Sequence, residues 1–205
     1  MKYVELKEGL KDFTLFSLND IRLLDEQFHR RRLNEWQKKN YIKKIVRGYY
    51  VFSDLKMDEN VLFEIANKIY SPSYISLEMA FSYYGLIPES VYEVTSISTR
   101  KTYSFKTPVA KFSFKSIKPD FFWGYEIKRY GTKTFKIAEP EKAVLDYFYF
   151  NSGIATRREF ESMRFNNEVF SRLVNLKKFL LYLNRFHQKA LQKRVGLFLE
   201  FMKNA

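Results

Sequence analysis

Residues 25–52 read DEQFHRRRLNEWQKKNYIKKIVRGYYVF, and this stretch decides how the first part of the chain folds. Its first half predicts a basic amphipathic helix over roughly residues 26–39, with Asp25 as the residue that caps its start. Apolar residues at helix-like intervals face a core and leave the charges on the opposite side. The inward positions are Phe28, Leu33 and Trp36.

The second half of the stretch predicts a β-hairpin. Residues 41–46 and 49–52 are rich in β-branched and aromatic side chains, and Arg47-Gly48 between them forms the turn. A helix followed at once by such a hairpin is how a winged helix-turn-helix presents itself to DNA. One face of the helix packs on a small core while the other face meets phosphates.

The residues before this stretch complete the same module. Ser17 is a suitable N-cap, and Asp20 takes the place of the Glu in a capping box, which predicts a short helix over residues 18–24. Residues 2–11 are predicted to form the first helix. Only a tight turn fits between the two later helices, as a helix-turn-helix requires. Residues 1–54 are therefore predicted to be a winged helix-turn-helix DNA-binding domain.

This module is strongly basic where DNA would lie. Between Arg30 and Arg47 the chain has eight basic residues and one acid, Glu35. Arg, Asn and Gln can make bidentate contacts with base edges, whereas basic residues of a wing suit phosphate or minor-groove contacts. The alternative is that these charges form only a solvated helix face. The candidate DNA-binding residues are Gln27, Arg30, Arg31, Asn34 and Lys38 on the helix, and Lys43, Lys44 and Arg47 on the wing.

Residues 55–150 are predicted to form a second, mixed α/β domain. An amphipathic helix is expected over residues 58–70. Ser73 caps the next predicted helix, over residues 74–84, and Gly85 ends it. The join to the first domain is short and has no Pro- or Gly-rich linker, which favours domains that are coupled rather than independent.

Five strand-like runs and a helix follow in this domain. Their alternation and the Gly or Pro breaks between them predict an antiparallel sheet. Residues 138–150 return to a helical pattern, in which Pro140 is tolerated in the first turn and Lys142 and Asp146 are spaced to pair. The predicted strands cover residues 92–99, 101–106, 111–115, 122–129 and 132–137.

Residues 151–205 are predicted to be a basic helical extension packed on the second domain, with helices over residues 156–163, 169–182 and 185–202. This segment has 11 basic and 4 acidic side chains in a chain of net charge +13. A basic surface attracts nucleic acid, but an acidic partner protein or a plain solvated face fits it equally. The basic residues of this helical face, which has little acidic compensation in the sequence, are Arg157, Arg158, Arg164, Arg172, Lys177, Lys178, Arg185, Lys189, Lys193 and Arg194.

Composition narrows the class of protein. Hydrophobic residues make up 46% of the chain, as in globular proteins, and the lack of cysteines excludes disulfides and cysteine nucleophiles. No apolar run approaches the roughly 18 to 20 residues that span a bilayer, and the first residues lack a signal-peptide pattern, so a cytoplasmic protein without membrane contact is expected. The two histidines, His29 and His187, have no metal-ligand spacing, and no P-loop, GxGxxG or GxSxG motif occurs. We therefore expect no catalytic residues, no metal site, no cofactor and no enzyme activity.

Four strings of residues occur in order within residues 70–150. They are Pro-Ser-Tyr-Ile-Ser-Leu-Glu, Tyr-Tyr-Gly-Leu-Ile-Pro-Glu, Thr-Arg-Lys and Glu-Pro-Glu-Lys-Ala. With the wing string Arg47-Gly48-Tyr49-Tyr50, they resemble the AbiEi family, the antitoxins of bacterial type IV toxin–antitoxin systems that act in abortive infection. The resemblance covers about residues 13–150, and the tail after Asn151 resembles only a helical extension.

The resemblance implies a function. Members of the family repress their own operon by binding inverted repeats of double-stranded DNA, and they oppose a nucleotidyltransferase-fold toxin encoded beside them, with or without direct contact. It implies that repression rests on the DNA-binding candidates and antitoxicity on residues 58–205. Two copies are expected on DNA, whether the protein is a monomer or a weak dimer in solution. The antitoxin-surface candidates are Arg100 and Lys101 between two predicted strands, and Lys177 and Lys178 among the basic helices.

Two other interpretations stay open at this point. The chain fits a stand-alone winged-helix transcription factor whose second domain senses a ligand or dimerises. It also fits an RNA-binding or protein-interaction module that uses the basic C-terminal helices. The sequence gives neither the operator nor the target of a toxin.

Overall fold

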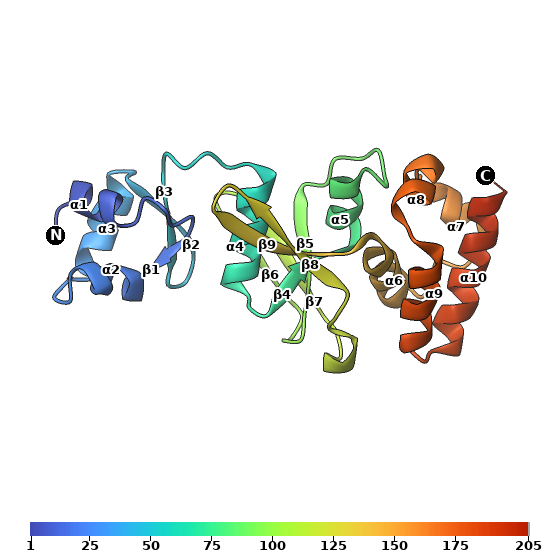
Figure 1. Ribbon diagram of the computed structural model, residues 1–205. Coiled ribbons are helices and arrows are strands. Elements are labelled where there is room, and N and C mark those ends of the chain that lie inside the picture. Colours follow the sequence, from blue (N-terminus) through green and yellow to red (C-terminus); the bar gives the residue numbers. More distant parts are fainter. Residues whose placement is uncertain (205) are drawn as a thin grey trace.

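The computed structural model describes residues 1–204, and in it three groups of elements follow one another along an elongated α+β molecule (Figure 1). The N-terminal elements lie at one end, a six-stranded sheet with its helices lies in the middle, and the C-terminal helices lie at the other end. None of the helices in the described part of the chain is long and apolar enough to cross a membrane.

The N-terminal part contains three helices and three strands. They are α1 (Tyr3–Gly9), β1 (Phe16–Ser17), α2 (Leu18–Leu24), α3 (Arg31–Lys38), β2 (Ile42–Val46) and β3 (Tyr49–Phe52). The strands form a small antiparallel sheet in the order β1-β3-β2. The predicted capping box is confirmed, because Ser17 N donates to the Asp20 carboxylate at 2.6 Å and the Ser17 side chain accepts from Asp20 N. Gly48 closes the hairpin at φ +90°, a conformation that glycine adopts without strain.

The prediction that the third helix begins near residue 26 is wrong. Asp25 ends α2, and its carboxylate pairs with the amino group of Met1 at 2.9 Å, so it does not cap the next helix. Its carbonyl oxygen accepts from Phe28 N at 3.0 Å, which closes a turn. The helix therefore begins at Arg31.

A small core belongs to the N-terminal part. Phe28, Leu33 and Trp36 are buried, as the apolar spacing predicts, and they pack with Leu6 and Ile21 from the first two helices. The rings of Phe28 and Trp36 lie 5.3 Å apart between centroids. Because α3 buries this side, its opposite side faces solvent.

The middle part is built on a mixed sheet of six strands. Its elements are α4 (Glu59–Ile69), β4 (Ser73–Ile75), α5 (Leu77–Tyr84), β5 (Glu93–Ser98), β6 (Tyr103–Lys106), β7 (Lys111–Ser116), η1 (Pro119–Phe121), β8 (Tyr125–Tyr130), β9 (Lys133–Ala138) and α6 (Pro140–Phe150). The sheet has the order β6-β7-β5-β4-β9-β8.

The prediction of a wholly antiparallel sheet is wrong. β5 pairs with β7 and β4 pairs with β9 in parallel, whereas the other neighbours are antiparallel. The reason is topological: β6 lies at the edge, and β7 returns between β6 and β5, so it runs in the direction of β5. Strand alternation in a sequence does not show which strands become neighbours.

A second correction concerns the start of α5. Residues 73–75 are not the first turn of a helix but the strand β4, which lies between β5 and β9 in the sheet. Ser73 is therefore not a cap, and Ser76 stands at the N-cap position of α5. Gly85 ends this helix at φ +68°, as predicted.

The C-terminal part is helical, with α7 (Arg157–Ser162), α8 (Asn167–Leu173), α9 (Leu176–Arg185) and α10 (Lys189–Lys203). The single helix predicted over residues 169–182 is wrong, because the chain breaks before Asn175, whose Oδ1 accepts from Lys178 N at 3.1 Å and caps α9. These helices share one core with α6, where the rings of Phe148 and Phe198 lie 4.9 Å apart.

The N-terminal part is joined to the middle part by a buried carboxylate. Thr14 Oγ1 donates to Glu64 Oε2 at 2.6 Å, and the Tyr130 hydroxyl donates to the same oxygen. Glu64 is only 4% exposed, and Lys68 pairs with its other oxygen at 2.6 Å. Apolar side chains of the first part also join the larger core: Leu15, Ile45 and Val51. The contact between the two parts is therefore both polar and apolar.

Candidate nucleic-acid interface

The outer side of α3 carries three of the predicted DNA-contacting residues. Arg31, Asn34 and Lys38 are exposed and lie three and four positions apart, so they follow one side of the helix. Leu33 and Trp36 hold the other side in the core. This is the division of faces that the sequence predicts.

Two other predicted residues, Gln27 and Arg30, are exposed in the turn before α3 rather than on the helix itself. Arg32 differs from its neighbours, because its Nη1 donates to the carbonyl oxygen of Met1 at 2.6 Å and its guanidinium lies 5.7 Å from the Trp36 ring centroid. Arg32 therefore fixes α3 to the chain before α1.

The β2–β3 hairpin follows α3 in the chain and carries the three other predicted basic residues. Lys44 and Arg47 are exposed, the second at the turn, whereas Lys43 is half-buried. β3 pairs with β2 on one side and with β1 on the other, so the hairpin is fixed to the module by backbone hydrogen bonds. A hairpin held in this way presents its basic residues in a fixed position.

The charges of this surface have no acidic partners. Arg32 aside, seven basic side chains belong to α3, the residues at its two ends and the hairpin, and within residues 1–204 none of the seven is in an ion pair shorter than 4.0 Å. These side chains are Arg30, Arg31, Lys38, Lys39, Lys43, Lys44 and Arg47. A polyanion that binds here can pair with these side chains without first breaking internal salt bridges, and it releases its own counterions. We name this set the basic α3 surface.

The antitoxin-surface candidates Arg100 and Lys101 lie in the turn between β5 and β6, and both are exposed. The Arg100 guanidinium lies 4.2 Å from the centroid of the Tyr70 ring, and the Tyr70 hydroxyl donates to the carbonyl oxygen of Lys101 at 2.6 Å. The turn is thus fastened to the end of α4. Its charged groups still reach solvent.

The expectation that the basic helical face has little acidic compensation is wrong at several positions. Lys178 pairs with Glu139 at 3.0 Å and with Glu141 at 3.2 Å, and although burial lowers its pKa, these carboxylates raise it above the ordinary value. Arg157 pairs with Glu161, and Arg164 pairs with Glu89. Lys177 is exposed and is in no ion pair within residues 1–204. Of the two lysine candidates on α9, Lys178 therefore holds α9 to the start of α6 through its ion pairs, and Lys177 alone is left to contact a partner.

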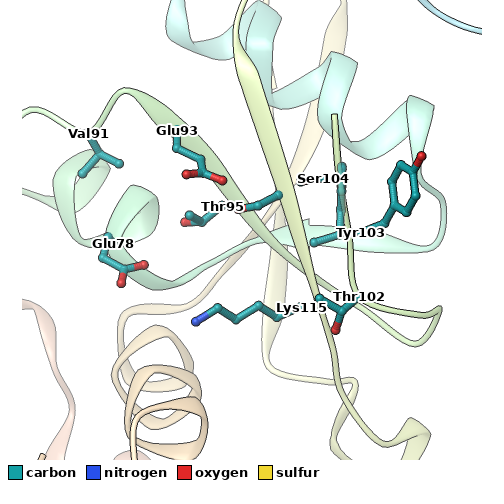
Figure 2. Close-up of a pocket in the computed structure, with 10 residues that line it drawn as sticks. Glu78, Val91, Glu93, Thr95, Thr102, Tyr103, Ser104 and Lys115 are labelled. Carbon is teal, nitrogen blue, oxygen red and sulfur yellow. The ribbon is translucent and has the colours of Figure 1, made fainter. Parts of the chain in front are cut away.

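An open groove of about 780 Å³ lies over β5, β6 and β7 beside α5. In Figure 2, Glu78, Glu93, Thr95 and Lys115 point into the same space, whereas the ring of Tyr103 points away from it. Glu93 pairs with Lys111 at 2.8 Å, and Thr95 Oγ1 donates to the carbonyl oxygen of Ser76 at 2.7 Å. The parallel pairing of β5 and β7 brings these residues together, so sequence reasoning missed them.

A buried ion pair lies in the centre of the molecule. Lys142 Nζ pairs with Asp146, and neither side chain has any exposed surface, which confirms the predicted pairing along α6. The hydroxyls of Tyr74 and Ser76 donate to Asp146 at 3.0 and 2.9 Å. Both oxygens of this carboxylate face donors and the cluster is closed to solvent, so loss of either charged partner alone would leave an uncompensated buried charge.

The described residues contain no group of three or more His, Asp or Glu side chains arranged to hold a metal ion. Comparison of the chain with models of known protein families and with curated proteins found no match. The basic α3 surface, with its seven basic side chains in no ion pair within residues 1–204, is therefore the site taken as the functional candidate.

Proposed function

We propose that the N-terminal part is a winged helix-turn-helix that binds double-stranded DNA, and that the protein is an autorepressor and antitoxin of the AbiEi type. The observation that carries the DNA-binding proposal is the basic α3 surface. Its seven cations have no acidic partners within residues 1–204, while the apolar side of the same helix forms the module core. The order of elements α1-β1-α2-α3-β2-β3 supports a winged helix, with α3 as the recognition helix and β2–β3 as the wing.

The test is a gel-shift titration on the DNA upstream of the gene for this chain, at two salt concentrations. The variant Arg31→Ala/Lys38→Ala removes two charges from the outer side of α3. We expect tight, salt-sensitive binding by the wild-type chain. In the variant, the slope of log affinity against log salt should fall by about 0.9 for each phosphate that the protein no longer neutralises. Removal of a hydrogen bond to a base edge should cost about 1–3 kcal/mol in addition.

The matched control is Lys189→Ala/Lys193→Ala, which removes the same charge from α10 at the far end of the molecule (Figure 1). This control should bind like the wild-type chain. If both variants lose affinity equally, net charge and not the basic α3 surface explains the binding. If the wild-type chain binds this DNA no tighter than random DNA, the repressor proposal fails.

The antitoxin part of the proposal rests on the family resemblance and has a separate test. A gene for a nucleotidyltransferase-fold protein should lie beside the gene for this chain, and its expression should arrest growth unless this chain is also made. Protection that survives Arg31→Ala/Lys38→Ala would place antitoxicity outside the basic α3 surface. If no such gene is adjacent, a stand-alone transcription factor becomes the better description.

One observation favours the alternative of a protein-interaction module. Three leucines of α9 are exposed, Leu176, Leu180 and Leu181, and Lys177 lies among them. The test compares the binding of two charge-reversal variants, Lys177→Glu on α9 and Arg31→Glu on α3. The Lys177 substitution leaves the ion pairs of Lys178 intact. A loss of partner or RNA binding in Lys177→Glu, with DNA binding retained, would favour this alternative.

A further inference from the structure

An apolar groove lies among α8, α9 and α10, at the end of the molecule opposite to the basic α3 surface (Figure 1). Its volume is about 400 Å³. α9 and α10 lie side by side, and Gln192 Nε2 donates to Asn184 Oδ1 at 3.4 Å near the turn that joins them. The apolar walls of the groove are Phe170 of α8, Val174 directly after it, Leu176 of α9, and Leu199 and Met202 of α10.

The α9 wall carries leucines that the core does not cover. Leu176 and Leu180 lie four positions apart, on one side of the helix, and their exposed fractions are 46% and 43%. Phe179 and Leu183 form the core side of the same helix. Single exposed leucines are common, but neighbouring ones beside an apolar groove are typical of a surface that contacts another molecule.

The α10 wall has a gap at Gly196. This residue is four positions after Gln192 and three before Leu199, so the three lie on one side of α10, the side that carries Leu199 to the groove. A Cβ at Gly196 would meet no atom within 4 Å outside its own stretch of helix. Glycine inside a helix is destabilising relative to alanine, and packing within the chain does not account for it here. The gap leaves room for another backbone to approach α10.

The charges around the groove determine which partner fits. In the described part of the chain, Lys203 is the one charged residue that lines the groove, and Lys177 lies on α9 between the two exposed leucines. Neither lysine is in an ion pair shorter than 4.0 Å within residues 1–204. Residues 151–205 carry 11 basic and 4 acidic side chains, so a second copy of this surface would meet it with like charge. An acidic partner is complementary to it.

We propose that this groove binds an acidic amphipathic helix of another protein. The apolar side of that helix packs on Leu176, Leu180 and Leu199, and its carboxylates pair with Lys177 and Lys203. α9 has 10 residues and is about 15 Å long, which matches a partner helix of about three turns. Laying an amphipathic helix into an apolar groove is a common mode of peptide recognition. The groove is far from the basic α3 surface, so the proposal does not depend on DNA binding (Figure 1).

The experiment measures the binding of three fluorescent peptides of about 15 residues to the full chain by fluorescence anisotropy. The first peptide has leucine on one side of its helix and glutamate on the others. The second has lysine in place of glutamate, and the third has serine in place of leucine. We expect the leucine–glutamate peptide to saturate the chain at one per chain, and the other two to bind at least about tenfold more weakly.

Two results with these peptides would overturn the proposal. One is failure of the leucine–glutamate peptide to saturate the chain at about 1 mM. The other is equally tight binding of the serine peptide, which would show attraction to any polyanion, nucleic acid included. Sedimentation of the chain alone tests a third occupant, because a dimer that Leu180→Glu dissociates would show that a second copy covers the groove.

Variants locate the binding. Leu180→Glu changes an exposed side chain and should weaken binding of the leucine–glutamate peptide at least about tenfold, with DNA binding in the gel shift retained. Leu23→Glu is the matched control, because Leu23 is 85% exposed on α2 at the other end of the molecule. Lys177→Glu/Lys203→Glu should weaken the glutamate peptide and strengthen the lysine peptide. Equal losses in Leu180→Glu and Leu23→Glu, or no gain for the lysine peptide, would overturn the site.

A further variant keeps the test valid if Leu180→Glu does not fold. Gly196→Gln places a side chain in the gap on α10 without changing the charge, and glutamine favours a helix more than glycine does. The urea midpoint of the variant should therefore rise, while binding of the leucine–glutamate peptide should weaken at least about tenfold. Wild-type affinity in Gly196→Gln would overturn the placement of a helix in this groove.

Discussion

Replacing Glu64 by Gln tests the contact that joins the N-terminal part to the rest of the molecule. The substitution keeps the shape of the side chain and removes its charge. Glu64 accepts hydrogen bonds from Thr14 and Tyr130 at one oxygen, and Lys68 pairs with the other. Burial raises the pKa of this carboxyl, but the Lys68 pair and the two hydroxyl donors outweigh it, so the pKa lies below 4.5 in the folded chain.

The size of the effect follows from these three contacts. A hydrogen bond to a charged group contributes about 1.5–3 kcal/mol and one between neutral groups about 0.5–1.5 kcal/mol, so neutralising the acceptor of Thr14 and Tyr130 costs about 1 kcal/mol for each. The pair with Lys68 adds at most about 1 kcal/mol, because the Lys68 side chain is 44% exposed. We expect Glu64→Gln to lower the free energy of unfolding by about 2–3 kcal/mol near neutral pH.

The effect depends on pH in a defined direction. Because the pKa of Glu64 is lowered by folding, the unfolded chain takes up its proton first, and the stability that the carboxylate provides is complete above pH 4.5. It is lost as the pH falls through the lower folded-state pKa. The difference between the wild-type chain and Glu64→Gln should therefore be largest near neutral pH and should shrink as the pH is lowered below 4.5.

Urea unfolding followed by tryptophan fluorescence measures this difference. The chain has two tryptophans, Trp36 in the N-terminal core and Trp123 in the middle part, so the signal reports both. Glu200→Gln, on the exposed surface of α10, is the matched control and should change stability by less than about 0.5 kcal/mol. A loss in Glu64→Gln that is no larger than in the control, or that stays constant below pH 4.5, would show that the Glu64 charge does not stabilise this contact.

Three further substitutions test other parts of the fold, each by urea unfolding. Asp146→Ala leaves the buried Lys142 without a counter-ion and should cost about 3–5 kcal/mol, and the double variant with Lys142→Met should lose clearly less than the sum of the single losses. Gly85→Ala adds a Cβ that meets no atom within 4 Å, so only its positive φ matters, and the loss should be about 1–2 kcal/mol. Phe198→Ala opens a cavity in the core shared by α6 and the C-terminal helices and should cost about 3–5 kcal/mol. A loss below about 1 kcal/mol for Asp146→Ala or Phe198→Ala, or no measurable loss for Gly85→Ala, would contradict the assigned role.

The local chemistry of the chain predicts much of its secondary structure. The helix α2 has the bounds predicted from the Ser17 and Asp20 capping pattern, and the β2–β3 hairpin turns at Gly48 as expected. Both features depend on residues within a few positions of one another. The same holds for the pairing of Lys142 and Asp146 along α6.

The errors arise where distant residues decide the structure. Asp25 has the sequence character of a cap, but the Met1 amino group takes its carboxylate. The three residues of β4 are too few to show an alternating strand pattern, and they become a strand because β5 and β9 lie on either side. For the candidate sites, the exposed residues of α3 follow from helical spacing, whereas the groove over β5, β6 and β7 depends on which strands become neighbours and has no signal in the sequence.

The position of β4 in the sheet also has a consequence for synthesis of the protein. Ile75 of β4 pairs with Ile137 of β9, so one side of this strand has no partner until residues 133–138 have been made. The elements of the N-terminal part are complete at Phe52, and domains fold from the N-terminus as the chain leaves the ribosome. Until then the nascent protein carries an N-terminal part whose Leu15, Ile45 and Val51 are not yet covered by the larger core, attached to an unpaired strand edge, and such an edge is open to aggregation or to chaperone binding.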